Sequence, residues 1–167
     1  LRFNRRLLTE TLCKYPTTFD AFCELINNAV QAGATQVDIT VDYVAEEKVS
    51  AIPFTFIEVR DNGCGVHKDD FEKKLLEVAT DAKAGGQGIG RFAGLQLGKT
   101  LEIESCGKSP LSNGPATRTT VTLRRDLLAA GSNLAEQNID VDYEEVEKHS
   151  TFFRIRVSDL YSENEIK

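Results

Sequence analysis

The chain has 167 residues, of which 41% are hydrophobic and 28% are charged, and its formal net charge is −6. This length and composition predict one globular domain with a sizeable core. The acidic balance argues against a nucleic-acid surface formed by the whole domain, and no apolar run approaches the roughly 18 residues that span a bilayer.

The four cysteines are widely spaced, and two histidines are the other residues that favour zinc. No Cys-x-x-Cys pair occurs, which is unfavourable for structural zinc, and four cysteines are too few for a disulfide framework. We therefore expect reduced thiols in a cytoplasmic protein. These residues are Cys13, Cys23, Cys64, Cys106, His67 and His149.

The two ends of the chain look like cut ends, because the first residue is Leu1 and the last residues are polar. Residues 1–16 mix basic and apolar positions, which fits either a short helix or an arm outside the main fold. The expected organisation is an arm over 1–16, one domain over 17–161, and a truncated exit to a following domain over 162–167.

Residues 19–32 are predicted to form a helix. Thr17 and Thr18 can accept the free amide hydrogens of its first turn, and Gly33 is expected to end it. Apolar residues recur at spacings of three and four, which predicts a buried stripe. The stripe comprises Phe19, Phe22, Cys23, Ile26, Ala29 and Val30.

Glu24, Asn28 and Gln31 lie one above another on a second face of this helix. One interpretation is a solvated polar face. The other is a site in which the amide oxygen binds a hard cation while the carboxylate handles a proton.

Residues 36–44 and 52–60 are predicted to be strands of an antiparallel hairpin, because apolar positions alternate with polar ones in the first. Asp61 follows the second strand, within Asp61-Asn62-Gly63-Cys64-Gly65. This run is either a simple turn or a carboxylate presented beside bare backbone to a flat ligand such as a nucleobase. Further strands are expected at 100–105, 118–125, 139–143 and 152–157.

Residues 67–79 are predicted to form another helix, and a glycine-rich run follows at 85–90. Glycines allow the backbone to approach a ligand closely, and the helix after them would offer its amide hydrogens to an anion such as phosphate. The run is neither a Walker loop nor a dinucleotide fingerprint.

The order of these features resembles the GHKL ATP-binding module of gyrase B, heat-shock chaperones, histidine kinases, MutL and MORC proteins. The segment from Glu24 to Ala34 resembles the first box, with Glu-x-x-x-Asn. The Asp61–Val66 segment matches the Asp-x-Gly-x-Gly box, and the run Gly85-x-x-Gly88-x-Gly90 matches the second glycine box.

The resemblance implies α+β architecture: a two-layer α/β sandwich (Bergerat fold), with a mixed, mostly antiparallel sheet and helices on one face. It implies ATP and Mg²⁺ as ligands, with Asp61 accepting from the adenine amino group, Gly63 and Gly65 beside it, Asn28 on Mg²⁺ and Glu24 as general base. The phosphates would be held by Lys83, Gly86, Gly88, Ile89 and Gly90.

The chain departs from the family's pattern at two places. Gln31 stands where the family often has Asp. The last box, usually Gly-Thr, has two candidates, of which we favour Thr151 over Thr119 because a strand and Asp159-Leu160-Tyr161 follow it.

The resemblance implies a slow Mg²⁺-dependent ATPase that drives lid closure and ATP-dependent homodimerisation in a larger protein, with residues 66–84 as lid. Glu24 favours hydrolysis over a histidine-kinase activity. A nucleotide-gated switch with little turnover is the alternative, and a degenerate module without nucleotide is a third. The family's following domain supplies a lysine to the γ-phosphate, so this piece alone is expected to bind ATP but turn it over slowly.

Overall fold

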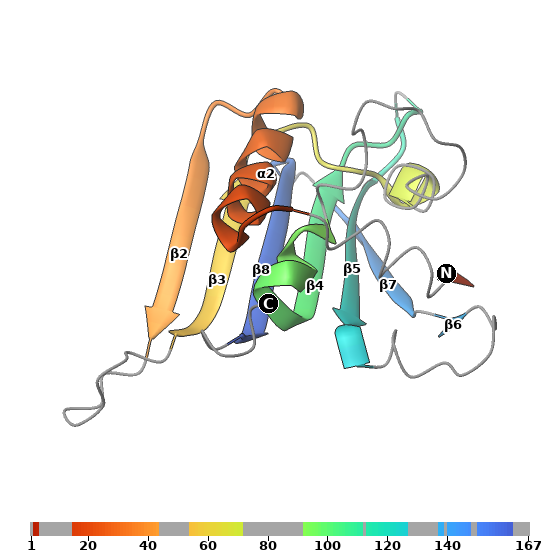
Figure 1. The fold of residues 1–167 in the computed structure, drawn as a ribbon. Coiled ribbons are helices and arrows are strands. Elements are labelled where there is room, and N and C mark those ends of the chain that lie inside the picture. Colours follow the sequence, from red (N-terminus) through yellow and green to blue (C-terminus); the bar gives the residue numbers. More distant parts are fainter. Residues whose placement is uncertain are drawn as a thin grey trace.

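The computed structural model describes residues 2–3, 15–43, 54–71, 92–111, 113–126, 137–138, 140–147 and 150–161. Within these ranges, helices α2 (Thr18–Gln31) and α4 (Gly94–Leu97) lie on one face of a six-stranded sheet (Figure 1). A two-stranded pair joins β1 (Arg2–Phe3) to β6 (Gln137–Asn138). The strands of the large sheet are β2 (Val37–Tyr43), β3 (Phe54–Asp61), β4 (Gly98–Gly107), β5 (Ala116–Arg124), β7 (Val141–Val146) and β8 (Phe152–Leu160).

The sheet has the strand order β2-β3-β8-β4-β5-β7, and each pairing is antiparallel. The predicted hairpin is confirmed, with Val37 opposite Asp61. The prediction of an α+β sandwich is also confirmed, although the described strands contain no parallel pair that would make the sheet mixed. The last strand, β8, inserts between β3 and β4, which brings the start of β8 next to Asp61.

The N-terminal end of α2 is fixed by a capping box. The amide of Asp20 donates to Thr17 Oγ1 (3.1 Å), and the amide of Thr17 donates to Asp20 Oδ2 (3.1 Å). Gly33 follows the helix with a φ of +70°, a left-handed conformation that favours glycine. Both predicted helix limits are confirmed to within one residue.

The predicted apolar stripe of α2 is only partly right: Ala29 is buried and Phe22 packs against the core, but the buried face is shifted. Ala21, Leu25 and Ala29 form the buried face, whereas Phe19 and Val30 are 70% and 67% exposed. Two of the three buried residues are alanines, and such small side chains allow a helix axis to lie close to a sheet. Spacing alone did not distinguish this face from the larger apolar residues beside it.

The hydrophobic core lies between the helices and the sheet. Inward positions alternate along β4, β5 and β8, as the period of two requires. The missing Cβ of Gly94 lets α4 approach this layer, because a Cβ there would stand 2.6 Å from Leu101 Cδ1. The core includes Leu25, Val59, Phe71, Phe92, Leu95, Leu101, Ile103, Val121, Leu123, Ile155 and Val157.

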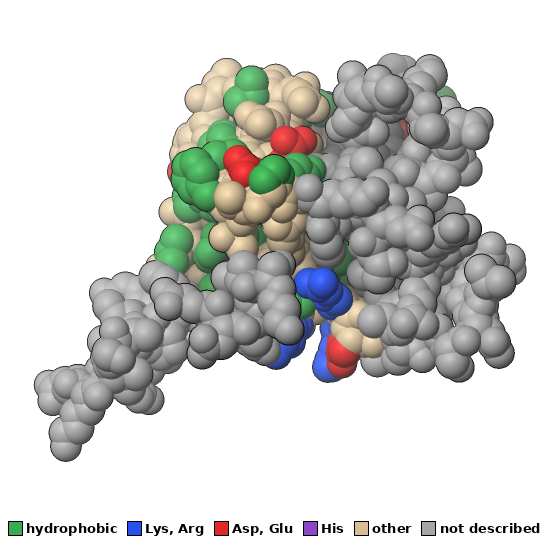
Figure 2. Space-filling model, in the orientation of Figure 1, with side chains coloured by type: hydrophobic (Ala, Val, Ile, Leu, Met, Phe, Trp, Pro, Cys, Tyr) green, Lys and Arg blue, Asp and Glu red, His purple; other side chains and the backbone are tan. Residues whose placement is uncertain are grey.

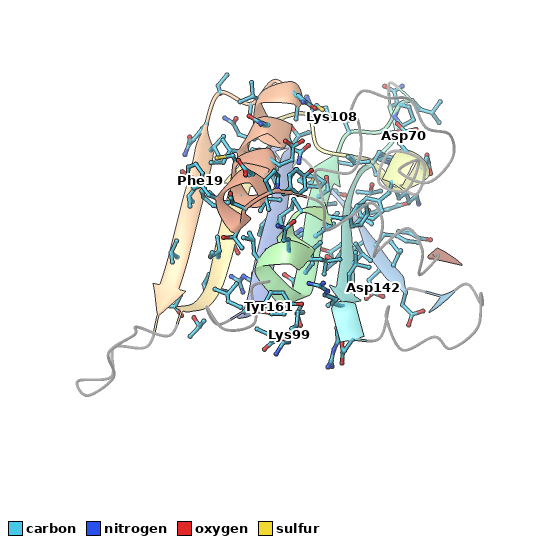
Figure 3. All side chains as sticks on the ribbon, viewed as in Figure 1. Phe19, Asp70, Lys99, Lys108, Asp142 and Tyr161 are labelled. Atoms are coloured by element: carbon cyan, nitrogen blue, oxygen red, sulfur yellow. The ribbon has the colours of Figure 1, made fainter. Side chains whose placement is uncertain are left out.

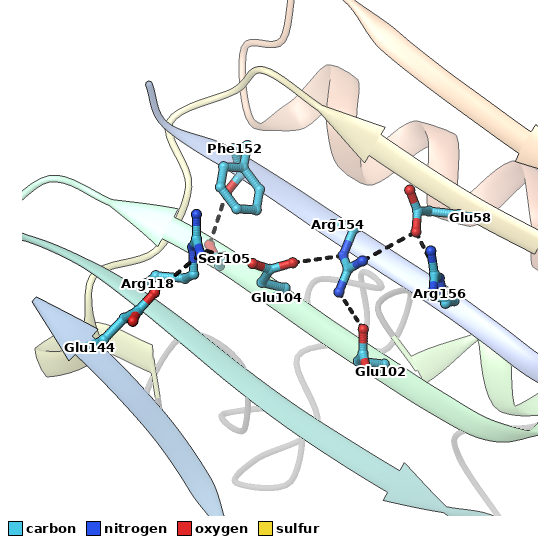
Figure 4. Close-up of polar contacts among 9 residues, drawn as sticks. All are labelled: Glu58, Glu102, Glu104, Ser105, Arg118, Glu144, Phe152, Arg154 and Arg156. Carbon is cyan, nitrogen blue, oxygen red and sulfur yellow. Dashed lines mark hydrogen bonds and ion pairs between the residues drawn. The ribbon is translucent and has the colours of Figure 1, made fainter. Parts of the chain in front are cut away.

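The opposite face of the sheet carries a row of ion pairs across five strands (Figure 4). Arg154 lies between Glu58 (3.3 Å) and Glu104 (2.8 Å), and Arg118 joins Glu104 (3.4 Å) to Glu144 (3.1 Å). These charges largely neutralise each other, which keeps this face polar without a strong field of one sign. The row comprises Glu58, Glu102, Glu104, Arg118, Glu144, Arg154 and Arg156.

Candidate functional site

Asp61 ends β3 with its side chain turned into the protein, where it is only 6% exposed. Its Oδ1 accepts a hydrogen bond from the amide of Gly63 at 2.8 Å. A carboxylate carries two oxygens, each of which can accept more than one hydrogen bond. The structure therefore presents an oriented, buried acceptor at the predicted position.

The turn after Asp61 is fastened to the segment that leaves α2. Asn62 Oδ1 accepts from the amides of Thr35 (2.9 Å) and Gln36 (3.0 Å), and its Nδ2 donates to Thr35 Oγ1 (2.9 Å). The amide of Cys64 donates to the carbonyl of Ala32 (3.2 Å). Asn62 was not predicted to have a role beyond its place in the turn, and its preference for local backbone bonds was the available signal.

The two glycines of this turn are required by close packing. A Cβ on Gly63 would stand 2.8 Å from Asp61 Oδ1, and one on Gly65 would stand 1.9 Å from the carbonyl oxygen of Cys106. Gly65 also has a φ of +59°. Because the protein itself fills the space beside Gly65, a further role for this glycine towards a ligand stays a prediction.

Ser105 joins the continuation of this turn to two central strands. Its Oγ accepts from the amide of Val66 (2.8 Å) and donates to the carbonyl of Phe152 (3.2 Å), with all three groups buried. The turn is thus held at both ends, by α2 on one side and by β4 and β8 on the other. Sequence reasoning missed Ser105, because alternation along a strand does not reveal which loop an inward hydroxyl reaches.

Thr151 directly precedes β8, and Asp61 pairs with Phe153 in the register of β3 and β8. Thr151 therefore lies two positions before Phe153, the partner of Asp61. Thr119 lies on β5, which is separated from β3 by β8 and β4, and its buried Oγ1 has no hydrogen-bond partner. The arrangement favours Thr151 as a neighbour of the Asp61 turn.

Glu24 and Asn28 occupy consecutive turns of α2, and the next turn ends at Ala32, where the Asp61 turn is attached. The Asn28 amide is half-buried, and its Nδ2 has no hydrogen-bond partner. Such a group requires compensation by a ligand or water. The unpartnered NH₂ group is a donor and would pair with an anionic oxygen such as that of a phosphate, whereas the carbonyl of the same amide is a group that a hard cation prefers.

Glu24 is half-buried and accepts a long hydrogen bond from Asn27 Nδ2 (3.4 Å). Burial raises the pKa of the Tyr15 phenol to about 12, and the negative charge of Glu24 contributes to the same shift. A glutamate carboxylate is a group that can accept a proton from water. Gln31, the third residue of the predicted face, is exposed.

Five predicted phosphate-binding residues lie outside the described residues, as does most of the predicted 67–79 helix, of which 68–71 is helical. The segment after the glycine run is described and contains α4, the expected following helix. The residues outside are Lys83, Gly86, Gly88, Ile89 and Gly90.

Three further observations bear on the expected class of protein. Within the described part of the chain, no helix is long and apolar enough to cross a membrane. Cys23, Cys64 and Cys106 are free thiols. Hydrophobic side chains are exposed over α2 and β2 on the face drawn in Figure 2.

Comparison with known proteins identifies relatives of the chain. The model of a family described as "Histidine kinase-, DNA gyrase B-, and HSP90-like ATPase" matches residues 16–151. The DNA mismatch repair protein MutL of Yersinia pestis is 39% identical over 57 residues, which cover 34% of this chain and 8% of that protein. The matched part is thus a small share of the curated relative's length.

Two solved structures are similar to the chain at low sequence identity. One is the Aquifex aeolicus MutL ATPase domain complexed with ADP, with a TM-score of 0.47 and 18% identity, covering 87% of this chain and 43% of that one. The other is the N-terminal domain of a DNA repair protein, with a TM-score of 0.46 and 17% identity, covering 93% of this chain and 39% of that one.

Proposed function

Because this chain belongs to the histidine kinase-, DNA gyrase B- and HSP90-like ATPase family, we propose that it binds ATP with Mg²⁺ and hydrolyses it slowly. In this proposal the nucleotide cycle closes a lid and brings two copies together within a larger protein. The GHKL-type ATP-binding domain provides the nucleotide site, and slow hydrolysis would set how long the lid stays closed.

The observation that carries the proposal is the order of functional groups along α2. Glu24, Asn28 and the attachment point of the Asp61 turn follow one another at one-turn intervals. Each α-helical turn rises about 5.4 Å, so the three groups span roughly the length of a nucleotide from terminal phosphate to base. A solvated polar face would not need a buried carboxylate at one end and an unpartnered buried amide in the middle.

At the base end, Asp61 accepts a hydrogen bond from the adenine amino group. Gly63 keeps the carboxylate oriented through its amide, Gly65 allows the turn to close on β4, and Thr151 contributes from β8. At the other end, Lys83 and the backbone of Gly86, Gly88, Ile89 and Gly90 hold the phosphates. The roles proposed for Asp61, Gly63 and Gly65 agree with the hydrogen bonds that hold the backbone of this turn in place.

Asn28 would hold Mg²⁺ through its amide oxygen, and the ion, when bound, neutralises phosphate charge. Glu24 takes the proton from the attacking water. The water oxygen forms a bond to the γ-phosphorus while the bond from that phosphorus to the β–γ bridging oxygen breaks, giving ADP and phosphate. We expect slow turnover, because the 3.4 Å contact from Asn27 orients Glu24 weakly.

A nucleotide-gated binding module with little turnover is the second candidate, and the same weak orientation of Glu24 favours it. The two candidates share the binding site and differ in whether Glu24 changes the rate of phosphate release.

The test combines isothermal calorimetry with ATP and Mg²⁺ and a phosphate-release assay on Glu24→Ala. We expect Glu24→Ala to keep nucleotide binding while hydrolysis disappears, and the exposed-residue control Glu147→Ala to match the original chain. No binding heat at millimolar nucleotide would refute the proposal, and equal hydrolysis in Glu24→Ala and the original chain would remove Glu24 from the role of base. Binding without any hydrolysis in the original chain would select the second candidate.

A further inference from the structure

The strand β2 lies at one end of the six-stranded sheet and has an open edge over residues 37–42 (Figure 1). β3 pairs with one side of β2, and no described strand pairs with the other. Residues 38–42 are all exposed. The backbone amides and carbonyls on this side are therefore available to an added strand.

The face of β2 that is turned towards the helices is apolar but only partly covered. Ile39 lies opposite the buried Val59 in the register, which places it on the helix side of the sheet. Val37, on the same face, packs against the core, whereas Ile39 and Val41 are 47% and 44% exposed. An apolar face is thus left exposed beside the open edge.

Two side chains of α2 extend this apolar surface. Phe19 and Val30 are 70% and 67% exposed, and they stand about three helical turns apart, so they share one side of the helix. Phe19 lies on the β2 side of α2 (Figure 3), and hydrophobic side chains gather over both elements (Figure 2). Part of the predicted apolar stripe of α2 therefore lies outside the core. Contiguous exposed apolar surface of this kind marks interaction sites.

The outer face of β2 is acidic. Asp38 accepts a hydrogen bond from Gln36 Nε2 (2.9 Å), and both groups are exposed. Asp42 accepts from Thr55 Oγ1 (2.6 Å), so both carboxylates are bonded to neutral donors. Arg60 is opposite Asp38 in the register, but its Cζ lies over an aromatic ring of β8, 4.3 Å from the centroid. Both carboxylates therefore keep a negative charge that favours cations in an added strand.

The other edge strand, β7, is protected from such pairing. Glu145 lies opposite the buried Thr117 and pairs with Lys68 Nζ (3.2 Å), and the same ammonium lies over the ring of Tyr143 (4.6 Å from the centroid). Charges that point inwards commonly keep an edge strand from pairing. The inner positions of β2 from Val37 to Val41 carry no charge. The two edges differ in this respect, and β2 is the one suited to accept a strand.

We propose that the β2 edge binds an extended segment of a partner protein in which Lys or Arg alternates with β-branched or aromatic residues. The segment adds a strand to the sheet through its backbone, and its apolar side chains cover Ile39, Val41 and Phe19. Its cations lie beside Asp38 and Asp42. This surface is separate from the nucleotide site, and the inference does not depend on the proposed function.

A second copy of this chain fits the edge less well than a basic segment does. Antiparallel pairing of two β2 strands over their full length places Asp38 of one copy opposite Asp42 of the other. Like charges directly opposite each other destabilise a strand pair. The charges on the outer face therefore favour a partner of opposite charge.

The experiment measures binding of a fluorescein-labelled peptide, Lys-Val-Lys-Ile-Lys-Val-Lys, to the whole chain by fluorescence anisotropy. We expect saturable binding that weakens about fivefold in Asp38→Asn/Asp42→Asn and about threefold in Ile39→Thr. The matched control Asp140→Asn/Asp142→Asn removes two exposed charges on and beside β7 and should bind as the original chain does. A peptide with Glu in place of each Lys should not bind.

Two peptides methylated on backbone amides separate strand pairing from general attraction between a basic peptide and an acidic protein. In an added strand, alternate amides face β2 and the others face solvent. Methylation of one set, either the lysine amides or those of the apolar residues, should abolish binding, and methylation of the other set should preserve it.

Equal binding of the two methylated peptides would overturn the inference. Equal weakening in the Asp140→Asn/Asp142→Asn control, or no saturation at millimolar peptide, would also overturn it. Sedimentation velocity of the chain alone supplies the remaining test. A dimer that Ile39→Thr abolishes would place a second copy on the β2 edge and contradict a basic partner segment.

Discussion

The two ends of the candidate site are built in different ways. The proposed base end, from Asp61 to Val66, is fixed by hydrogen bonds to the segment that follows α2 and to Ser105 of β4, whose hydroxyl also bonds to β8. The catalytic end on α2 has Asn28 with an unpartnered amide and Glu24 with one long contact. In the proposed function, this difference corresponds to a preformed surface for the base and an end that becomes fully bonded only with its ligand.

The largest expected effect is on the base end, in Gly65→Ala. A Cβ there would stand 1.9 Å from a backbone oxygen at a φ of +59°, so we expect a loss of more than about 4 kcal/mol of stability, or no folding. Urea unfolding would measure this loss. Gly33→Ala is the matched control, because Gly33 has a φ of +70° with nothing within 4 Å of a Cβ, and it should cost only about 1 kcal/mol. Equal costs for the two variants would show that the base end is not tightly packed.

Ser105→Ala tests the attachment of the same turn to the sheet. The substitution leaves the buried amide of Val66 without its acceptor, so we expect a loss of about 2 kcal/mol in urea unfolding. Ser158→Ala, on the neighbouring strand β8, is the control and should change stability by less than about 0.5 kcal/mol. A stability loss no greater than that of the control would contradict a preformed base end.

Asn28→Leu separates the two ends most clearly. Without nucleotide, it should leave stability unchanged or raise it, because an unpartnered buried amide is removed. With Mg·ADP it should weaken binding about tenfold, or about 1.4 kcal/mol. Thermal unfolding with and without ligand measures both effects, and a large loss of stability in the nucleotide-free protein would show that the amide already has a structural role.

Thr17→Ala concerns the start of α2, ahead of the catalytic end, and should have the smallest effect. It removes the acceptor of the Asp20 amide, which costs about 1 kcal/mol. Circular dichroism during thermal unfolding would detect the change. The N-cap explanation fails if Thr17→Ser, which keeps the hydroxyl, loses as much stability as Thr17→Ala.

Local patterns were sufficient for much of the fold. The Thr17 cap, the Gly33 end, the β2–β3 hairpin and the strands around Ile103 and Ile155 follow from spacing and turn chemistry. The buried face of α2 did not follow completely, because the small residues Ala21 and Ala29 give a weaker apolar signal than larger neighbours such as Phe19 and Val30. A strand was predicted at 139–143, whereas β7 begins at Val141 and continues to Val146.

The candidate site likewise contains residues that local patterns predict and residues that depend on long-range contacts. Glu24, Asn28 and Asp61 could be selected because each lies in a short local motif. Ser105 could not, since its partner Val66 is 39 positions away, and single-sequence periodicity carries no information on such pairs. The row of ion pairs around Arg154 was missed for the same reason, because it exists only after five strands have aligned.

The most direct test of the account is calorimetric titration of Mg·ADP into the original chain and Asp61→Asn. The amide at position 61 can still accept from Gly63, but it would turn a donor towards the donating amino group of adenine. We predict binding by the original chain and a loss of at least about 100-fold in affinity for a folded Asp61→Asn variant. Equal affinity of the two proteins would contradict the assignment of Asp61 as the residue that selects the base.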